Sequence, residues 1–135
     1  PGTYTIQFKV RNNLNGQETL ATQSVVVIGN TGTNGSVAIT NIQPVSGAAG
    51  TTIVITGSGF STTGNDVHFG VGGTKNVAAV NGSTIYYSIP HYVSPCDFTV
   101  GLCSSPAVLV QSGSYPVFVT NAQGTSQTFT FSVSQ

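Results

Sequence analysis

The sequence predicts an all-β protein: a two-sheet β-sandwich preceded by a β-hairpin. Three observations lead to this fold class. Apolar and polar residues alternate with a period of two along most of the apolar stretches, as they do in half-buried strands. Turn signals separate these stretches at short intervals, and the chain has 17 Gly and 6 Pro. No window shows the 3.6-residue period of an amphipathic helix.

The chain carries almost no charge. Of its 135 residues three are Lys or Arg and three are Asp or Glu, so the net charge is zero. This composition argues against nucleic-acid and anionic-membrane partners, because both need a basic footprint. No apolar run reaches the ~18 residues of a membrane helix. Little repulsion between molecules suits packing into an array or a filament. The alternative is a secreted domain kept soluble by Ser, Thr, Asn and Gln.

Residues 1–28 are predicted to form the hairpin. Its first strand, residues 4–11, alternates without error. The apolar face of this strand comprises Tyr4, Ile6, Phe8 and Val10. A turn with Asn15-Gly16 at its tip leads to a second strand at about residues 20–28. Residues 29–36 are rich in glycine and contain no apolar side chain, which indicates a flexible linker.

The apolar face of this hairpin needs a cover, because two strands alone are marginally stable in water. The chain begins at Pro1 without a methionine or a signal peptide, so we expect a processed precursor or a fragment. The cover is then upstream polypeptide or a neighbouring copy that accepts the two strands. We therefore interpret the apolar face as an assembly face.

The rest of the chain is organised around residues 44–60. Glycine turns bracket the short apolar run Ile53-Val54-Ile55, which is typical of a half-buried strand with Ile53 and Ile55 on one face. Phe60 follows the second turn and has no favourable place except under the sheet. Further strands are expected at about residues 37–42, 51–56, 66–69, 76–80, 84–89, 115–121 and 125–133. The predicted core consists of Ile53, Ile55, Phe60, Val117, Val119, Phe129 and Phe131.

A long connection, residues 91–111, carries both cysteines. Cys96 and Cys103 lack the Cys/His spacing of a zinc site. A local disulfide is the favoured interpretation and free thiols are the alternative. A disulfide places the protein outside a reducing cytosol.

An internal repeat links the two ends of the chain. The run from Gly2 to Phe8 matches the run from Gly113 to Val119, and each is followed by Asn, a glycine turn and another alternating strand. Tyr4 and Tyr115 both open their strands, where a hydroxyl can reach back to a loop carbonyl. Residues 1–28 therefore look like the last two strands of a preceding domain. The alternative is two generic hairpins that share common strand residues.

Residues 37–135 resemble the IPT/TIG family of immunoglobulin-like domains. The matching pieces are Pro44-Val45-Ser46-Gly47, the run from Gly50 to Phe60, Val67-His68-Phe69-Gly70, Ile89-Pro90, the run from Gly113 to Asn121, and Gly124-Thr125-Ser126. The resemblance implies an immunoglobulin-like β-sandwich of the E-set type. Members of the family occur in surface receptors, in transcription factors, beside starch-acting catalytic domains and as repeats in bacterial surface proteins. The hairpin resembles the tail of a PKD-like or bacterial Ig-like domain.

No catalytic or metal site is predicted, and no cofactor. Asp66 and His68 share one face of a strand, but two ligands are too few for a metal, and a capping aspartate beside a surface histidine is the simpler explanation. The candidate ligand-stacking residues are Tyr86, Tyr92 and Phe98, which lie on or beside the long connection and could stack on a sugar ring. The favoured interpretation is that these aromatic rings pack the connection onto the sandwich.

The sequence thus favours a non-catalytic structural or adhesive module of an extracellular, prokaryotic cell-surface protein or filament. Its partners would be neighbouring domains or copies of itself. The second hypothesis is an accessory carbohydrate-binding domain of a larger secreted enzyme, with a cell-surface glycan as partner. A Rel-like DNA-binding domain is disfavoured because the chain lacks basic loops.

Overall fold

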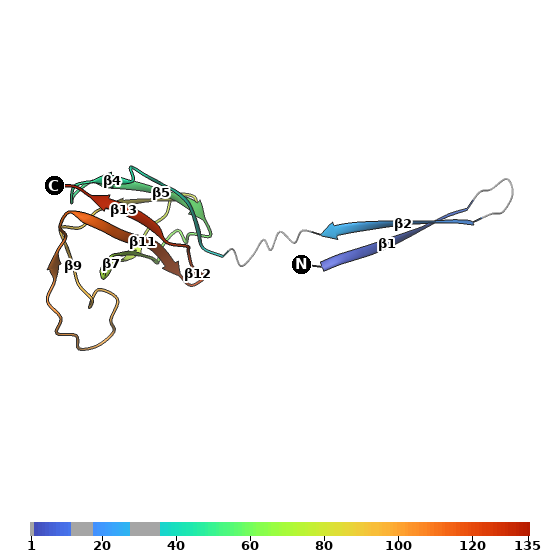
Figure 1. Ribbon diagram of the computed structural model, residues 1–135. Coiled ribbons are helices and arrows are strands. Elements are labelled where there is room, and N and C mark those ends of the chain that lie inside the picture. The colour runs from blue at the N-terminus through green and yellow to red at the C-terminus, as the bar shows by residue number, and fades with distance from the viewer. Residues whose placement is uncertain (1, 12–17, 28–35) are drawn as a thin grey trace. The chain divides into compact units, whose positions relative to one another are not determined.

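The structure, a computed structural model, describes the backbone of residues 2–11, 18–27 and 36–135, and the side chains from Ser36 onward. The chain divides into two compact units, Pro1–Thr33 and Asn34–Gln135. Every described element is a strand (Figure 1). Accordingly, these ranges contain no helix with the length and apolarity that a membrane crossing needs. The predicted hairpin tip at residues 12–17, Ile28 and most of the predicted linker lie outside the described residues.

The first unit is an antiparallel pair of β1 (Gly2–Arg11) and β2 (Glu18–Val27). The register runs without interruption from Gly2 opposite Val27 to Arg11 opposite Glu18. Both predicted strands are present, and each begins two residues earlier than the sequence suggested.

The second unit is a sandwich of two sheets, with a small ladder beside them. The three-stranded sheet has the order β3-β5-β8, with β3 (Ala38–Gln43), β5 (Thr52–Ser58) and β8 (Thr84–Ser88). The larger sheet has the order β4-β13-β11-β6-β7. Its strands are β4 (Ser46–Gly47), β13 (Phe129–Val133), β11 (Gly113–Asn121), β6 (Asn65–Phe69) and β7 (Gly72–Val77). The short strand β12 (Gly124–Thr125) also pairs with β11. The small ladder joins β9 (Tyr92–Val93) to β10 (Val108–Leu109).

The chain changes sheets early. Strand β3 pairs with β5, whereas β4, which follows after the cis bond between Gln43 and Pro44, pairs in parallel with β13 of the other sheet. A proline cannot donate to a ladder, so its position between the two strands suits the transfer. The stretch around residues 44–60 therefore contributes to both layers.

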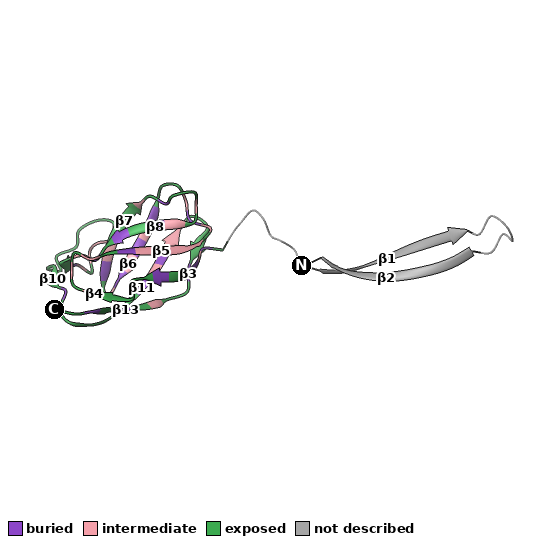
Figure 2. Ribbon diagram, turned by 90° about the horizontal axis from the view of Figure 1, so that it is seen from above, coloured by how far each residue is buried: buried purple, intermediate pink, exposed green. Residues whose placement is uncertain are grey.

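The core lies between the two sheets, where the inward faces of the strands meet (Figure 2). Of the seven predicted core residues, six are buried: Ile53, Ile55, Phe60, Val117, Val119 and Phe131. Phe129 is only partly buried and packs against the cluster from its edge. Phe60 does return under the sheet, and its ring lies against Gly57, where a Cβ would overlap both the ring and the Ala38 carbonyl.

Three strands of the larger sheet begin two or more residues away from the predicted positions. Strand β11 starts at Gly113 rather than at residue 115. Strand β7 starts at Gly72 rather than near residue 76, because a tight turn of two residues after Phe69 is enough to reverse the chain. Strand β13 starts at Phe129 rather than at residue 125. Between β12 and β13 the side-chain amide of Gln127 bonds the main-chain N–H and C=O of Ile39, which draws this segment away from the ladder towards β3.

A buried amide closes one end of the sandwich. The Asn65 side chain is fully buried; its Nδ2 donates to the carbonyls of Ser61 (2.6 Å) and Val77 (2.8 Å). Its Oδ1 accepts from the Ser61 N–H (2.8 Å) and from Asn121 Nδ2 (2.9 Å). Asn121 Nδ2 also donates to the Gly59 carbonyl (3.0 Å). Both atoms of the Asn65 amide are thus satisfied, as burial requires.

The predicted role of Tyr115 is confirmed. The Tyr115 hydroxyl donates to the Gln111 carbonyl (2.9 Å) and accepts from the Gln111 N–H (3.0 Å). Its ring stacks on Phe69 of the neighbouring strand, with centroids 4.8 Å apart. This residue therefore ties the loop before β11 to the core, in the manner of a tyrosine corner.

We predict that Ile55→Ala lowers the free energy of unfolding by about 2–4 kcal/mol, because the truncated side chain leaves a cavity in a fully buried position. Chemical denaturation of the whole chain measures the loss. Val54→Ala is the matched control, because Val54 points away from the core in the same strand and is half-buried. A loss below about 1 kcal/mol for Ile55→Ala would contradict the assigned faces of β5.

Candidate functional site

The long connection of residues 91–111, which we call the insertion, contains β9, the disulfide and β10. Its two ends are fixed to the domain: Val93 and Val110 are buried in the core, and the Val110 N–H donates to the His91 carbonyl (2.9 Å). The loop between β9 and β10 projects away from both sheets (Figure 1). The insertion thus has a fixed base and a projecting part.

One carboxylate anchors the projecting part to the larger sheet. Asp97 Oδ2 accepts hydrogen bonds from the N–H of Gly73 in β7 and from the N–H of Ser94, both at 2.9 Å. Bonds from backbone N–H groups to a carboxylate are charge-assisted and stronger than neutral ones. They hold the start of the loop against β7.

Two glycines make room for this anchor. A Cβ at Gly72 would overlap the Asp97 carboxylate and the Ser94 backbone, and a Cβ at Gly73 would overlap the Val67 carbonyl and the Phe98 ring. Gly73 also has a φ of +154°, which side-chain-bearing residues rarely adopt. The pair therefore permits a close approach that other residues would block.

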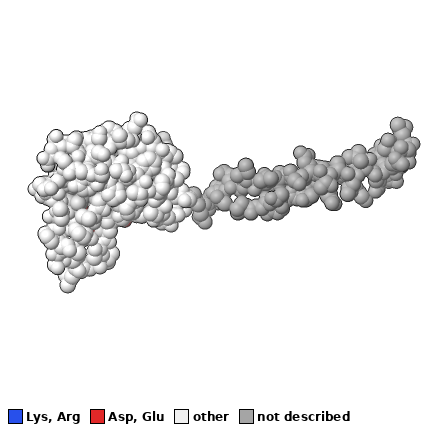
Figure 3. All heavy atoms as spheres, in the orientation of Figure 1, with Lys and Arg blue, Asp and Glu red and all other residues white. Residues whose placement is uncertain are grey.

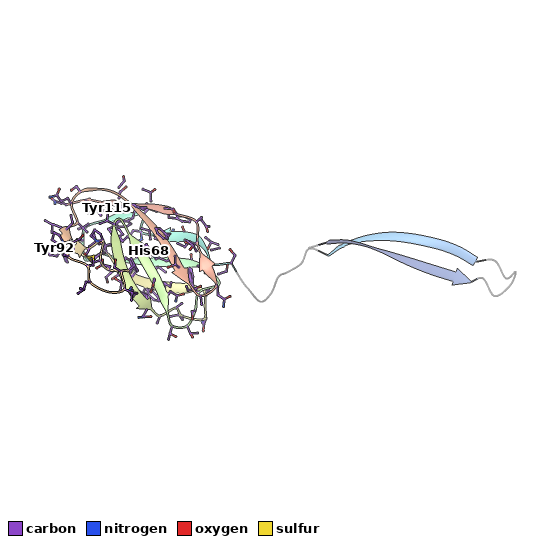
Figure 4. The ribbon with its side chains drawn as sticks, turned by 90° about the horizontal axis from the view of Figure 1, so that it is seen from below. His68, Tyr92 and Tyr115 are labelled. Atoms are coloured by element: carbon purple, nitrogen blue, oxygen red, sulfur yellow. A yellow bond between two sulfur atoms is a disulfide. The ribbon has the colours of Figure 1, made fainter. Side chains whose placement is uncertain are left out.

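An aromatic stack forms the second anchor. The imidazole ring of His68 lies between the rings of Phe98, in the insertion, and Phe118, in β11, with centroid distances of 3.9 Å and 4.2 Å. His68 Nε2 is 3.0 Å from Thr120 Oγ1. Burial lowers the pKa of His68, and the nearby Asp66 carboxylate opposes this shift in part. A neutral imidazole is therefore favoured within the stack. Figure 4 labels His68 on the sandwich.

Asp66 and His68 do not act as a pair of metal ligands in this arrangement. The Asp66 carboxylate accepts from the N–H of Asn76 (3.0 Å), which has a φ of +58°, so it caps the irregular end of β7 as expected. His68 is not the simple surface histidine of the prediction, because Phe98 covers one face of its ring. Among the described residues no group of three or more His, Cys, Asp or Glu side chains could hold a metal ion.

The predicted disulfide joins Cys96 to Cys103, with the two Cα atoms 5.7 Å apart. It closes a small loop directly after the anchoring residues. Val100 and Leu102 lie inside that loop and are almost wholly exposed to solvent. We call these two side chains the apolar tip.

The apolar tip is part of a larger uncharged surface. Three more apolar side chains of the insertion, Tyr92, Val108 and Leu109, are roughly half exposed or more. Asp97, the single charged residue of the insertion, is engaged in the anchor. In Figure 3 no charged side chain is visible on the described part of the face, and the insertion forms the lobe that projects from it. We call these five apolar side chains together the insertion surface.

The three candidate stacking residues do not form one platform. Phe98 stacks on His68, so the favoured interpretation, that this ring packs the connection onto the sandwich, is confirmed for Phe98. Tyr92 lies in β9 and Tyr86 in β8, and they are 61% and 60% exposed. No aromatic contact in residues 36–135 joins the three rings to one another.

Tyr86 lies on the outer face of the three-stranded sheet. The register places it in one row with Val54 and Gln43. The adjacent rows are Thr52 with Ser88, whose hydroxyls are 3.1 Å apart, and Asn41 with Thr56 and Thr84. The face around the Tyr86 ring is thus uncharged and lined with hydroxyl and amide groups.

Sequence reasoning located the insertion and its disulfide, and it included the packing of Phe98 onto the sandwich, but it identified neither His68 as the partner of that ring nor the anchor at Asp97. Asp97 is one acidic residue in a loop, and nothing local shows that its partner is the backbone of a distant strand. The one available signal was the pair Gly72-Gly73 directly after a strand, which indicates a close approach of another backbone or side chain.

The two packed sheets and the tyrosine corner define an immunoglobulin-like β-sandwich module. Residues 37–133 match the family model of the IPT/TIG domain, and the chain belongs to this family. A search among curated proteins finds no match to it. Domains of this family are generally non-catalytic, occur often in extracellular or signalling proteins and mediate contacts between proteins. The disulfide is in keeping with an oxidising environment.

We predict that Asp97→Ala detaches the insertion from β7 without unfolding the sandwich, because two backbone N–H groups lose their shared acceptor. Hydrogen–deuterium exchange should rise at Gly73 and across residues 94–99 while the β11 amides stay protected. The double variant Cys96→Ser with Cys103→Ser is the control, and in it only the tip should exchange faster. Unchanged protection at Gly73 in Asp97→Ala would show that this carboxylate is not the anchor.

Proposed function

We propose that this chain is a non-catalytic extracellular module of a prokaryotic cell-surface protein or filament. Its role is structural or adhesive, and it acts through surface and strand contacts with neighbouring domains or subunits. Its partners in this role are proteins, including copies of itself. Membership of the IPT/TIG family supports the protein contacts and the non-catalytic role.

The observation that carries the proposal is the anchored insertion with its exposed apolar tip. A mobile loop would lose conformational entropy on binding. Here the disulfide, the Asp97 bonds and the stack on His68 restrain the loop before any partner arrives. Large patches of exposed apolar side chains on a soluble protein often mark the sites where other proteins bind. The insertion surface therefore has the chemistry of a preorganised protein contact.

The near absence of charge supports the same role. Three charged side chains occur in residues 36–135, namely Asp66, Lys75 and Asp97. Neighbouring copies thus meet little long-range repulsion. The disulfide supports an extracellular location, since such bonds persist in oxidising compartments. The resemblance of the hairpin and the sandwich to modules of bacterial surface proteins supports the prokaryotic origin.

We predict that the double variant Val100→Ser with Leu102→Ser stays folded but loses self-association. Its mass by light scattering should remain monomeric at concentrations where the unchanged chain forms larger species, because the tip no longer buries apolar area. Val80→Ser is the control, since Val80 is also exposed but lies outside the insertion. The proposal fails if the unchanged chain is monomeric at all concentrations and electron micrographs of the native material show single particles.

A second candidate function is binding of a neutral polysaccharide by an accessory domain of a larger secreted enzyme. The observation that favours it is the uncharged, hydroxyl-lined face around Tyr86. An exposed ring can stack on a sugar ring while the surrounding hydroxyl and amide groups bond its hydroxyls.

We predict, for this second candidate, that an insoluble neutral polysaccharide retains the unchanged chain and that Tyr86→Ala reduces the retained fraction at least tenfold. Tyr92→Ala is matched in exposure but lies in the insertion, so it should bind normally. Equal retention of all three proteins, or of none, would remove this candidate.

A further inference from the structure

Strand β8 lies at one edge of the three-stranded sheet. It pairs with β5, and no other strand among the described residues pairs with it. Two hydrogen bonds at the ends of the β5–β8 ladder, both 2.8 Å long, define its pattern: the Gly57 N–H donates to the Ser83 carbonyl, and the Ile89 N–H donates to the Thr51 carbonyl. Bonded and non-bonded pairs alternate along an antiparallel ladder. Every second residue from Ser83 to Ile89 therefore bonds β5.

The residues between them, Thr84, Tyr86 and Ser88, turn their N–H and C=O groups towards the open side of the sheet. Thr84 shows this directly, because its N–H and C=O bond the main chain of Val80 (3.2 Å and 2.7 Å). No hydrogen bond joins the N–H or C=O of Tyr86 or Ser88 to another described residue, and both side chains are exposed. The second half of β8 is therefore an open edge.

The other edge strands of the two sheets are guarded against strand addition. The side-chain amide of Gln127 occupies the main-chain N–H and C=O of Ile39 in β3, and β4 is only two residues long. In β7, the carboxylates of Asp97 and Asp66 each accept from a main-chain N–H, and Lys75 adds a charge. Such caps, charges and short strands are what natural proteins use to block edges. In residues 36–135, β8 is the edge that has neither a charge nor a proline to protect its open half.

This open edge is complementary to itself. When a second copy lies antiparallel with its Tyr87 opposite Tyr87 of the first, Tyr86 of each copy lies opposite Ser88 of the other. Both residues direct an N–H and a C=O at the partner, so each N–H meets an acceptor. A longer strand would gain little more, because Val80 occupies the edge before Tyr86 and Pro90 has no N–H after Ser88. The edge is thus matched in length to a second copy of itself.

The outer face of such a joined sheet also suits the pairing. The Tyr86 ring of one copy would lie beside Ser88 and Thr52 of the other, whose hydroxyls are 3.1 Å apart. No charged side chain of β5 or β8 opposes a like charge across the junction, because neither strand contains one. Tyr86 is 60% exposed, so its ring loses contact with water on pairing.

We propose that two copies of this chain pair edge to edge through β8, so that their three-stranded sheets become one continuous sheet. This inference rests on the proposed role in contacts between copies and gives that role a surface other than the insertion. A few main-chain bonds and one ring per copy make a small interface, which is typical of weak contacts. We expect a pair that is transient in dilute solution and persists where copies are concentrated, as in an array.

Disulfide trapping between two differently substituted chains tests the register. A Tyr86→Cys chain is mixed with a Ser88→Cys chain under mild oxidation, with the Cys96–Cys103 bond intact. Residues in a hydrogen-bonded pair have Cα atoms about 5.5 Å apart, within the range of a disulfide. Identical residues of the two copies are two positions out of register, beyond the limit of ~7 Å. We expect the mixed dimer to form at least tenfold faster than the dimer of either chain alone.

Thr52→Cys provides the matched control. Thr52 is exposed on the same face, but it lies one strand farther from the edge. A mixture of the Thr52→Cys and Tyr86→Cys chains should therefore form no mixed dimer faster than either chain dimerises alone.

The same trapping in chains that also carry Val100→Ser with Leu102→Ser separates this inference from the proposed function. The mixed dimer should form at the same rate there, because the apolar tip is a different surface. Light scattering of the tip variant thus tests the insertion, whereas trapping tests β8. The inference is overturned if all mixtures are trapped equally, if identical chains are trapped faster, if nothing is trapped, or if the tip substitutions abolish the trapping.

Discussion

The side-chain amide of Asn65 is the interaction on which one end of the sandwich depends. Packing two sheets face to face buries apolar side chains, but it also buries the backbone groups where strands end and turns begin. Asn65 satisfies the Ser61 N–H, two carbonyls and the Asn121 amide at once. The turn after Gly59, the start of β6, the end of β7 and the end of β11 are thereby held in one network. An apolar residue at this place would fill the volume but leave these polar groups unpaired.

The insertion depends on the sandwich in a similar way. Its base is part of the apolar core, through Val93 and Val110, and its loop is held by an aromatic contact to β6 and a polar contact to β7. The disulfide then closes the distal part. The bonds of Asp97 and the stack of Phe98 restrain the loop near its base, and the disulfide restrains the tip, where the apolar side chains are most exposed. In the proposed contact role, part of the entropy of ordering is thereby lost before a partner binds.

Because the chain carries so little charge, exposed apolar area such as that of the insertion has a larger share in any contact the domain makes. A surface without charge gives little steering and little repulsion, so contacts depend on shape and on apolar area at defined places. In this IPT/TIG domain the sheets supply the frame, and the insertion supplies five of the nine large apolar side chains that are exposed in residues 36–135. The outer face around Tyr86 is different in kind, because hydroxyl and amide groups dominate it.

The sequence by itself determined the strands, their faces and the family. Alternation with a period of two assigned Ile53, Ile55, Val117 and Phe131 to the core, because a strand in a sandwich has one face towards the other sheet and one towards solvent. The disulfide was also predictable, since Cys96 and Cys103 are the two cysteines of the chain and lie in one loop. These features depend on neighbours along the chain.

Tertiary structure alone decided which residues anchor the insertion and close the sandwich. Asp97 bonds Gly73, 24 residues away, and Asn65 bonds Asn121, 56 residues away. Phe98 was a candidate for ligand stacking until its ring was placed on His68. Strand β13 begins late because Gln127 bonds the main chain of Ile39, 88 residues away. Such partners come together only when the sheets pack, so no local pattern in the sequence identifies them.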